Sequence, residues 1–161
     1  MAESGIAPRT LQTVPFVARL FLRAGIVYLV LTFTAGAVLL CLEAFGTPIP
    51  FTIGIEHGHM GFVGWLVNTV AGVALWLLPL NRQAFPQTQG RYPETAARTA
   101  FVMLNVGLPL RLIAEPLHEL HPSSATAAAL VLSALLQLAA IAVIGWIVWK
   151  RVYAPPLRPD V

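Results

Sequence analysis

Four histidines are the residues of this 161-residue chain best suited to bind a metal. Two of them, His57 and His59, open an apolar stretch that reads HGHMGFVGWLVNTV. The other two, His118 and His121, follow a second apolar stretch. A neutral imidazole nitrogen is a good ligand for haem iron, copper or zinc. Because positions 57 and 59 are about 200° apart on a helix, we expect the two imidazoles to face different surroundings. The alternative for all four is a polar residue at a helix end or in a loop.

Arg111 is the second residue with chemical potential, because it lies within an apolar segment. Two interpretations fit it. The guanidinium would hold an anionic group, such as a haem propionate, or it would pair with Glu115 one helical turn further along.

The composition places these residues in a membrane protein. Hydrophobic residues make up 57% of the chain and charged residues 11%, whereas soluble domains have roughly a quarter of their residues charged. The lipid bilayer is therefore the expected partner. No run of basic residues and no glycine-rich phosphate loop is present, so a nucleic-acid partner is not expected.

Four apolar segments are long enough to position the histidines in a bilayer. They cover approximately residues 24–45, 57–79, 95–116 and 125–149, each near the ~20 residues that a spanning helix needs. Short connections between them predict that neighbouring helices are antiparallel. The expected fold is an all-α integral membrane protein, with residues 1–161 forming a single antiparallel bundle of four transmembrane helices.

The basic residues predict the orientation of this bundle. Nine of the ten Lys and Arg residues flank one end of it, and Arg111 is the exception. Because positive charge favours the cytoplasmic side, both termini are predicted to be cytoplasmic and the four histidines to lie near the outer face. More than twenty residues precede the first apolar segment, so we expect an uncleaved first helix rather than a signal peptide.

Small and amide residues lie inside the expected helices. Asn68, Asn105 and Gln137 are near mid-membrane and are expected to form hydrogen bonds between helices, rather than a proton or ion path, because no carboxylate accompanies them. Three glycines of the second segment would allow close contact between helices or leave room for a flat ring: Gly61, Gly64 and Gly72.

Two segments resemble short four-helix bacterial membrane proteins that are similar to the catalytic subunit, subunit I, of haem–copper oxidases. The pattern H-x-H-x-x-x-x-G-W, then Gly, then Leu-Leu-Pro is matched by His57, His59, Gly64, Trp65, Gly72, Leu77, Leu78 and Pro79. The stretch NVGLPLR resembles their Asn-x-Gly-Leu-Pro segment, matched by Asn105, Gly107, Leu108 and Pro109. The resemblance covers about a third of the chain.

The resemblance implies a haem b site near the outer face of a bacterial inner membrane. Either His57 or His59 would be an axial ligand, with the second ligand from His118, His121 or another protomer. Arg111 would pair with a propionate. The sequence departs from the family where AFVMLN precedes the third-helix motif without a histidine. The copper ligands and the cross-linked tyrosine of an oxidase also lack counterparts, so no oxygen-reducing centre is expected.

Three hypotheses follow. The first is a small haem b protein for electron transfer or for sensing a redox state or a gas. The second, favoured by the missing third-helix histidine, is a cofactor-free structural or accessory membrane subunit. The third is an outer-face copper or zinc site made from the four histidines and Glu56. We expect no enzymatic activity of the hydrolytic or group-transfer kind, since no nucleophile–base pair is evident. The chain would work alone, as a homodimer or as a subunit of a respiratory complex.

Overall fold

The computed structural model describes residues 13–153, and these are helical with no strand among them. The helices are α1 (Phe16–Ala44), α2 (Phe51–His59), the π-helical η1 (Met60–Val67), α3 (Asn68–Leu77), the short 3₁₀ helix η2 (Pro86–Thr88), α4 (Glu94–Leu120) and α5 (Ser124–Val152). Because α2, η1 and α3 are continuous, the described chain has four helices long and apolar enough to cross a membrane. This confirms the prediction of an all-helical, multi-pass membrane protein.

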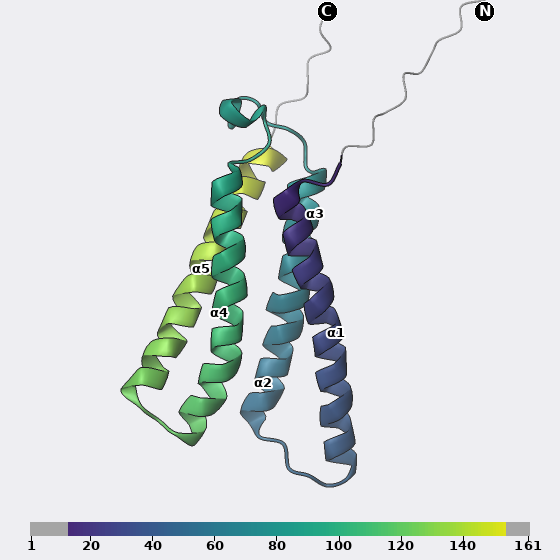
Figure 1. Cartoon of the computed structure of the whole chain (residues 1–161), viewed down its shortest axis with the longest axis vertical. Helices are drawn as coiled ribbons and strands as arrows, with labels where there is room; N and C mark the ends of the chain where they lie inside the picture. Colours follow the sequence, from purple (N-terminus) through teal and green to yellow (C-terminus); the bar gives the residue numbers. More distant parts are fainter. Residues whose placement is uncertain (1–12, 154–161) are drawn as a thin grey trace, which may run out of the picture.

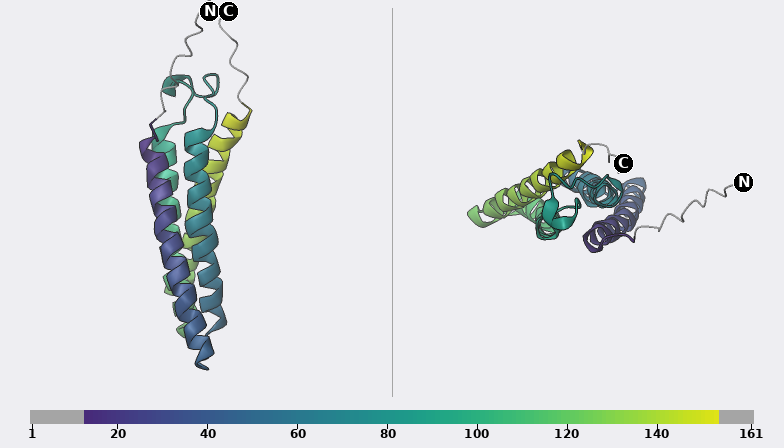
Figure 2. Two further views of the ribbon diagram at one scale, coloured as in Figure 1. Left: turned by 90° about the vertical axis from the view of Figure 1, so that its right-hand side faces the viewer. Right: turned by 90° about the horizontal axis from the view of Figure 1, so that it is seen from above.

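Two helical hairpins build the bundle (Figure 1). In one, α1 packs along η1 and α3; in the other, α4 packs along α5. The hairpins meet mainly through α4, which contacts α1, α2 and η1. Figure 2 shows the helices side by side along one long axis. We call the end formed by the start of α1, residues 78–93 and the end of α5 the loop end. The opposite end, with residues 45–50 and 121–123, is the histidine end.

The outer surface of the bundle is apolar, as expected for helices in lipid. Phe33 on α1 is 71% exposed and Leu138 on α5 is 66% exposed. In water such side chains would have to be covered, whereas lipid tails solvate them as well as a protein core does.

The helices extend beyond the apolar segments that predicted them. The first begins at Phe16 rather than near residue 24, the second at Phe51 rather than at His57, and the third continues to Leu120. Hydropathy identifies only the part of a helix within the hydrocarbon, but the backbone remains helical until a residue stops it. Prolines at positions 15, 50 and 93 immediately precede three of the helix starts, where their missing N–H is not needed. Ser123 caps α5, because its hydroxyl accepts a hydrogen bond from the Thr126 amide at 3.2 Å.

One buried amide pair links the two hairpins near mid-bundle. The Nδ2 atom of Asn105 donates to Oδ1 of Asn68 at 3.0 Å, and Asn68 donates to the Gly64 carbonyl at 2.8 Å. The predicted hydrogen bond between helices is confirmed for this pair. Gln137 makes no side-chain hydrogen bond within residues 13–153; instead its Cγ packs against Gly107 of α4. Its predicted polar contact is therefore not part of the described structure.

The glycines of the second helix serve close packing against α1. A Cβ atom at Gly64 would lie 2.6 Å from the Cγ and Cδ1 atoms of Tyr28, and one at Gly72 would lie 2.8 Å from Cγ of Leu22. Side chains of α1 therefore fill the space that a flat ring would need beside these two glycines.

We expect Gly64→Ala to lower the free energy of unfolding by about 1–3 kcal/mol, because the Tyr28 atoms in its way include Cβ, which is fixed to the backbone of α1 and lies 3.0 Å from the new methyl group. Unfolding of the purified protein in mild detergent, followed by circular dichroism, measures this change. Gly145→Ala on α5 is the matched control, because a Cβ there meets nothing within 4 Å. It should stabilise the protein by up to about 1 kcal/mol through helix propensity. Equal effects at both positions would contradict the close approach of α1.

Candidate functional site

His57 lies in the second turn of α2, with its imidazole directed at α1. A Cβ at Gly36 of α1 would lie 3.1 Å from Cε1 of this ring and 3.5 Å from Nε2. Because Gly36 has no side chain, the imidazole can pack directly against α1. The Nδ1 atom of His57 is buried and has no hydrogen-bond partner among the described residues. The ring lines an apolar cavity of about 270 Å³, together with Ala35, Val38, Leu39, Ile53, Glu56, Met60 and Leu112.

His59 has different surroundings, as the helical spacing predicts. Its Nδ1 atom lies 3.1 Å from the carbonyl oxygen of Ile55 and 3.7 Å from Oε1 of Glu56. Its side chain is 32% exposed. A donated Nδ1–H···O=C bond would fix the tautomer and leave Nε2 as the acceptor nitrogen. The two histidines are both half-buried and differ in whether Nδ1 has a hydrogen-bond partner.

Arg111 joins two carboxylates beside these histidines. Its Nε atom donates to Oε1 of Glu56 at 3.2 Å, and its Nη2 atom lies 2.6 Å from Oε2 of Glu115. The second contact is an ion pair by distance without hydrogen-bond alignment. The ion-pair interpretation of Arg111 is thus confirmed, and it extends to Glu56, which is only 5% exposed. The Oε2 atom of Glu56 is buried with no hydrogen-bond partner within residues 13–153.

The other two histidines lie near the end of α4. His118 is in its last turn, not beyond it as the sequence predicts, and its Nδ1 lies 2.7 Å from Oγ1 of Thr126. His121 is the exposed C-cap residue. Thr52 of α2 donates a hydrogen bond to Glu119 of α4. A cavity of about 520 Å³ opens here, lined by Thr52, Arg111, Glu115, His118, Glu119, Leu130, Val131 and Ala134.

The described side chains do not assemble a set of metal ligands. Within residues 13–153, no group of three or more His, Cys, Asp or Glu side chains is arranged to hold a metal ion. Zinc sites normally take three or four protein ligands, so the four histidines do not form one in this arrangement.

Haem iron requires fewer protein ligands, so His57 is the residue to compare with its needs. One imidazole nitrogen without a partner, beside apolar walls, matches the donor and the environment of a haem axial ligand. The cavity of about 270 Å³ lies below the range of roughly 300–1,000 Å³ typical of ligand pockets, so it encloses only part of such a group. Arg111 is already engaged by two carboxylates, and a propionate would compete with them.

A second cluster, at the loop end, is one that the sequence prediction missed. Arg151 is 1% exposed and donates to the carbonyls of Leu75 at 2.8 Å, Pro79 at 3.1 Å, Ala74 at 3.3 Å and also Leu78. The end of α3 leaves the Leu75 carbonyl without a helical partner, whereas the Ala74 carbonyl also accepts from the Leu78 amide at 3.2 Å. The Tyr92 ring lies 5.6 Å from the guanidinium carbon, and burial raises the pKa of its hydroxyl above the ordinary value.

The signal for this cluster was present in the spacing of α5. Arg151 stands four, seven and eleven residues after Ile147, Ile144 and Ala140, all of which are buried. That spacing puts Arg151 on the packed face of the helix, not among the exposed residues.

Comparison with known proteins adds no relative to this picture. No family model matches the chain, and no curated protein or solved structure matches it either. The resemblance to the haem–copper oxidase subunit therefore depends on the motif residues of the second and third membrane helices.

Proposed function

We propose that this chain is a small membrane protein that binds haem b through His57 at the histidine end of the bundle. Two observations on His57 support this proposal: its buried Nδ1 has no hydrogen-bond partner among the described residues, and its side chain lines an apolar cavity. A buried polar atom without a hydrogen bond costs free energy, and coordination to iron would offset that cost. Bound haem would supply one-electron transfer or the binding of a diatomic gas.

His57 is preferred over His59 because of their surroundings. His59 is one-third exposed, and its Nδ1 already lies at hydrogen-bond distance from a backbone carbonyl. His118, His121 or a second copy of the chain would provide the second axial ligand. Seven basic residues of the described chain lie at or near the loop end, which supports an orientation with that end in the cytoplasm of a bacterial cell: Arg19, Arg23, Arg82, Arg91, Arg98, Lys150 and Arg151.

A cofactor-free accessory subunit is the second candidate. The observation that favours it is the ion cluster of Glu56, Arg111 and Glu115. Within the described helices at the histidine end, Arg111 is the only arginine or lysine, and both its contacts are to the protein's own carboxylates. In this alternative the cluster joins α2 to α4, and the protein acts through contacts with other membrane subunits.

We expect the purified protein in mild detergent, after reconstitution with haem, to show a Soret band and sharp α and β bands on reduction. His57→Ala should abolish these bands, because it removes the iron ligand. His59→Ala is the matched control, two residues away on the same helix, and should retain them. A wild-type protein that stays colourless, or a loss of the bands only in His59→Ala, would rule out haem ligation by His57.

A further inference from the structure

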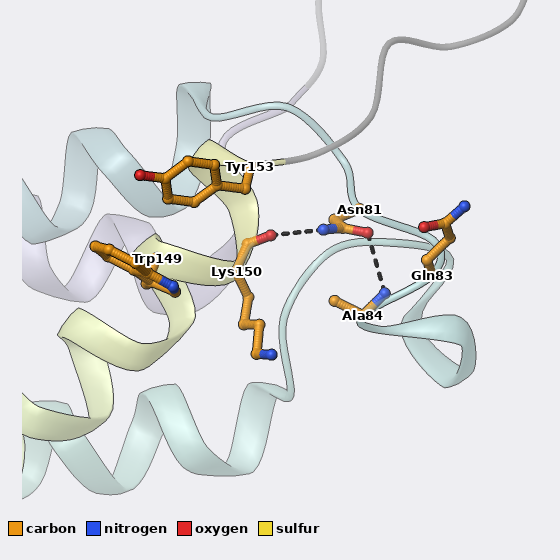
Figure 3. A pocket seen from close by; sticks show the side chains of 6 residues that line it. All are labelled: Asn81, Gln83, Ala84, Trp149, Lys150 and Tyr153. Carbon is orange, nitrogen blue, oxygen red and sulfur yellow. Dashed lines mark hydrogen bonds between the residues drawn. The ribbon is translucent and has the colours of Figure 1, made fainter.

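A cavity of about 500 Å³ lies at the loop end, away from the histidines. Two segments far apart in the sequence form it: the loop after α3 and the end of α5 (Figure 3). Its lining residues are Asn81, Gln83, Ala84, Trp149, Lys150 and Tyr153. This volume is within the range that ligand pockets occupy.

One hydrogen bond and one aromatic contact join the two walls of this cavity, and further hydrogen bonds order the loop. The Nδ2 atom of Asn81 donates to the Lys150 carbonyl at 2.6 Å, and its Oδ1 accepts from the Ala84 amide at 3.0 Å (Figure 3). The backbone of Asn81 also donates to Gly90 at 2.7 Å, and the Phe85 ring packs edge-on against Trp146 at 5.5 Å. The cavity is therefore a built feature of the fold, formed before any ligand binds.

The charge of the lining selects an anion. Lys150 is its only charged member, and this ammonium makes no ion pair with a carboxylate of the described residues. Gln83 lies on the opposite wall, with its amide directed away from the Lys150 ammonium (Figure 3). A lysine ammonium without a carboxylate partner favours an anionic group such as a phosphate.

The aromatic residues place the cavity at the level of lipid headgroups. Trp149 and Tyr153 are 64% and 67% exposed, and their rings pack 5.0 Å apart at the end of a membrane-spanning helix. Tryptophan and tyrosine concentrate where the hydrocarbon meets the headgroups. Below them, the exposed Trp146 offers an apolar surface along which an acyl chain can lie.

We propose that this cavity binds the phosphate of an anionic phospholipid in the leaflet at the loop end. Lys150 contacts the phosphate, and the rings of Trp149 and Tyr153 pack against the glycerol and the first acyl carbons. Basic pockets at helix ends are known to recognise anionic headgroups. The site is independent of the proposed haem site, which lies at the other end of the bundle.

The test measures lipid retained by the detergent-purified protein with native mass spectrometry. Phosphatidylglycerol and phosphatidylcholine of identical acyl chains are compared, and inorganic phosphate is added as a competitor. We expect preferential retention of phosphatidylglycerol, about fivefold weaker in Lys150→Gln and preserved in Lys150→Arg. The Lys150 backbone carbonyl that holds Asn81 is unchanged in both variants. Arg82→Gln removes an exposed charge from the same loop, outside the cavity, and should retain the lipid within twofold.

Three results would overturn the proposal. Equal retention of phosphatidylcholine, which has the same phosphodiester but no net charge, would show that the cavity does not select an anionic lipid. An equal loss in Arg82→Gln and Lys150→Gln would show attraction to the general charge of the loop end. Displacement of phosphatidylglycerol by millimolar inorganic phosphate would identify a free phosphate as the ligand.

Discussion

Replacing Arg151 with methionine is expected to lower the free energy of unfolding by about 3–5 kcal/mol. Methionine is apolar and has no hydrogen-bond donors, so the carbonyls of Leu75, Leu78 and Pro79 lose the Arg151 donor, while that of Ala74 keeps only the Leu78 amide. Each buried acceptor left without a hydrogen bond costs about 1–3 kcal/mol, and water can reach only some of them. The same contacts tie α5 to α3, so the hairpins should also separate more readily at the loop end.

Arg98→Met is the matched control for this experiment. Whereas Arg151 donates to buried carbonyls, Arg98 pairs with Glu94 on its own helix at 3.2 Å. These two side chains are 58% and 57% exposed. Exposed pairs of this kind contribute at most about 1 kcal/mol. Unfolding in mild detergent, followed by circular dichroism, compares the two variants with the wild type. An equal loss for both would mean that Arg151 contributes no more than a surface charge.

The sequence predicted the spanning helices because their physical cause is local. An apolar run of about twenty residues must cross the hydrocarbon as a helix, whatever surrounds it. The start of the second helix was placed six residues too late, at His57 instead of Phe51. Hydropathy falls in the stretch GTPIPFTIGIE, but the backbone is already helical after Pro50. The histidines consequently lie inside the helix, where the half-buried ring of His57 faces Gly36 of α1.

The partners of the two unusual arginines were only partly predictable. The spacing of Arg111 and Glu115 indicates an ion pair within one helix, and that pair is present. Glu56 lies 55 residues away in sequence, so its contact with Arg111 depends on how α2 packs against α4. Arg151 was interpreted only as positive charge near the cytoplasm. Its carbonyl partners are more than 70 residues distant, and no local pattern identifies them.

Removing the cation from the ion cluster is the second change with a large expected effect. Arg111→Met leaves the carboxylate of Glu56, 5% exposed, without its cation, and breaking a buried pair from one side costs about 3–5 kcal/mol. Both the free energy of unfolding and the contact between α2 and α4 should weaken. The same detergent unfolding assay measures the loss.

Which carboxylate causes that loss can be tested with a second substitution. Glu56→Gln in the Arg111→Met background removes the buried charge and should recover most of the stability, because a neutral amide is less costly to bury than an unpaired carboxylate. Glu115→Gln in the same background is the matched control. Its side chain is 25% exposed, against 6% for Glu56, so water already stabilises its charge and the recovery should be smaller. Equal recovery from the two glutamines would mean that the packing of α2 against α4 does not isolate Glu56 from solvent. A single Arg111→Met variant as stable as the wild type would mean that the cluster does not hold these helices together.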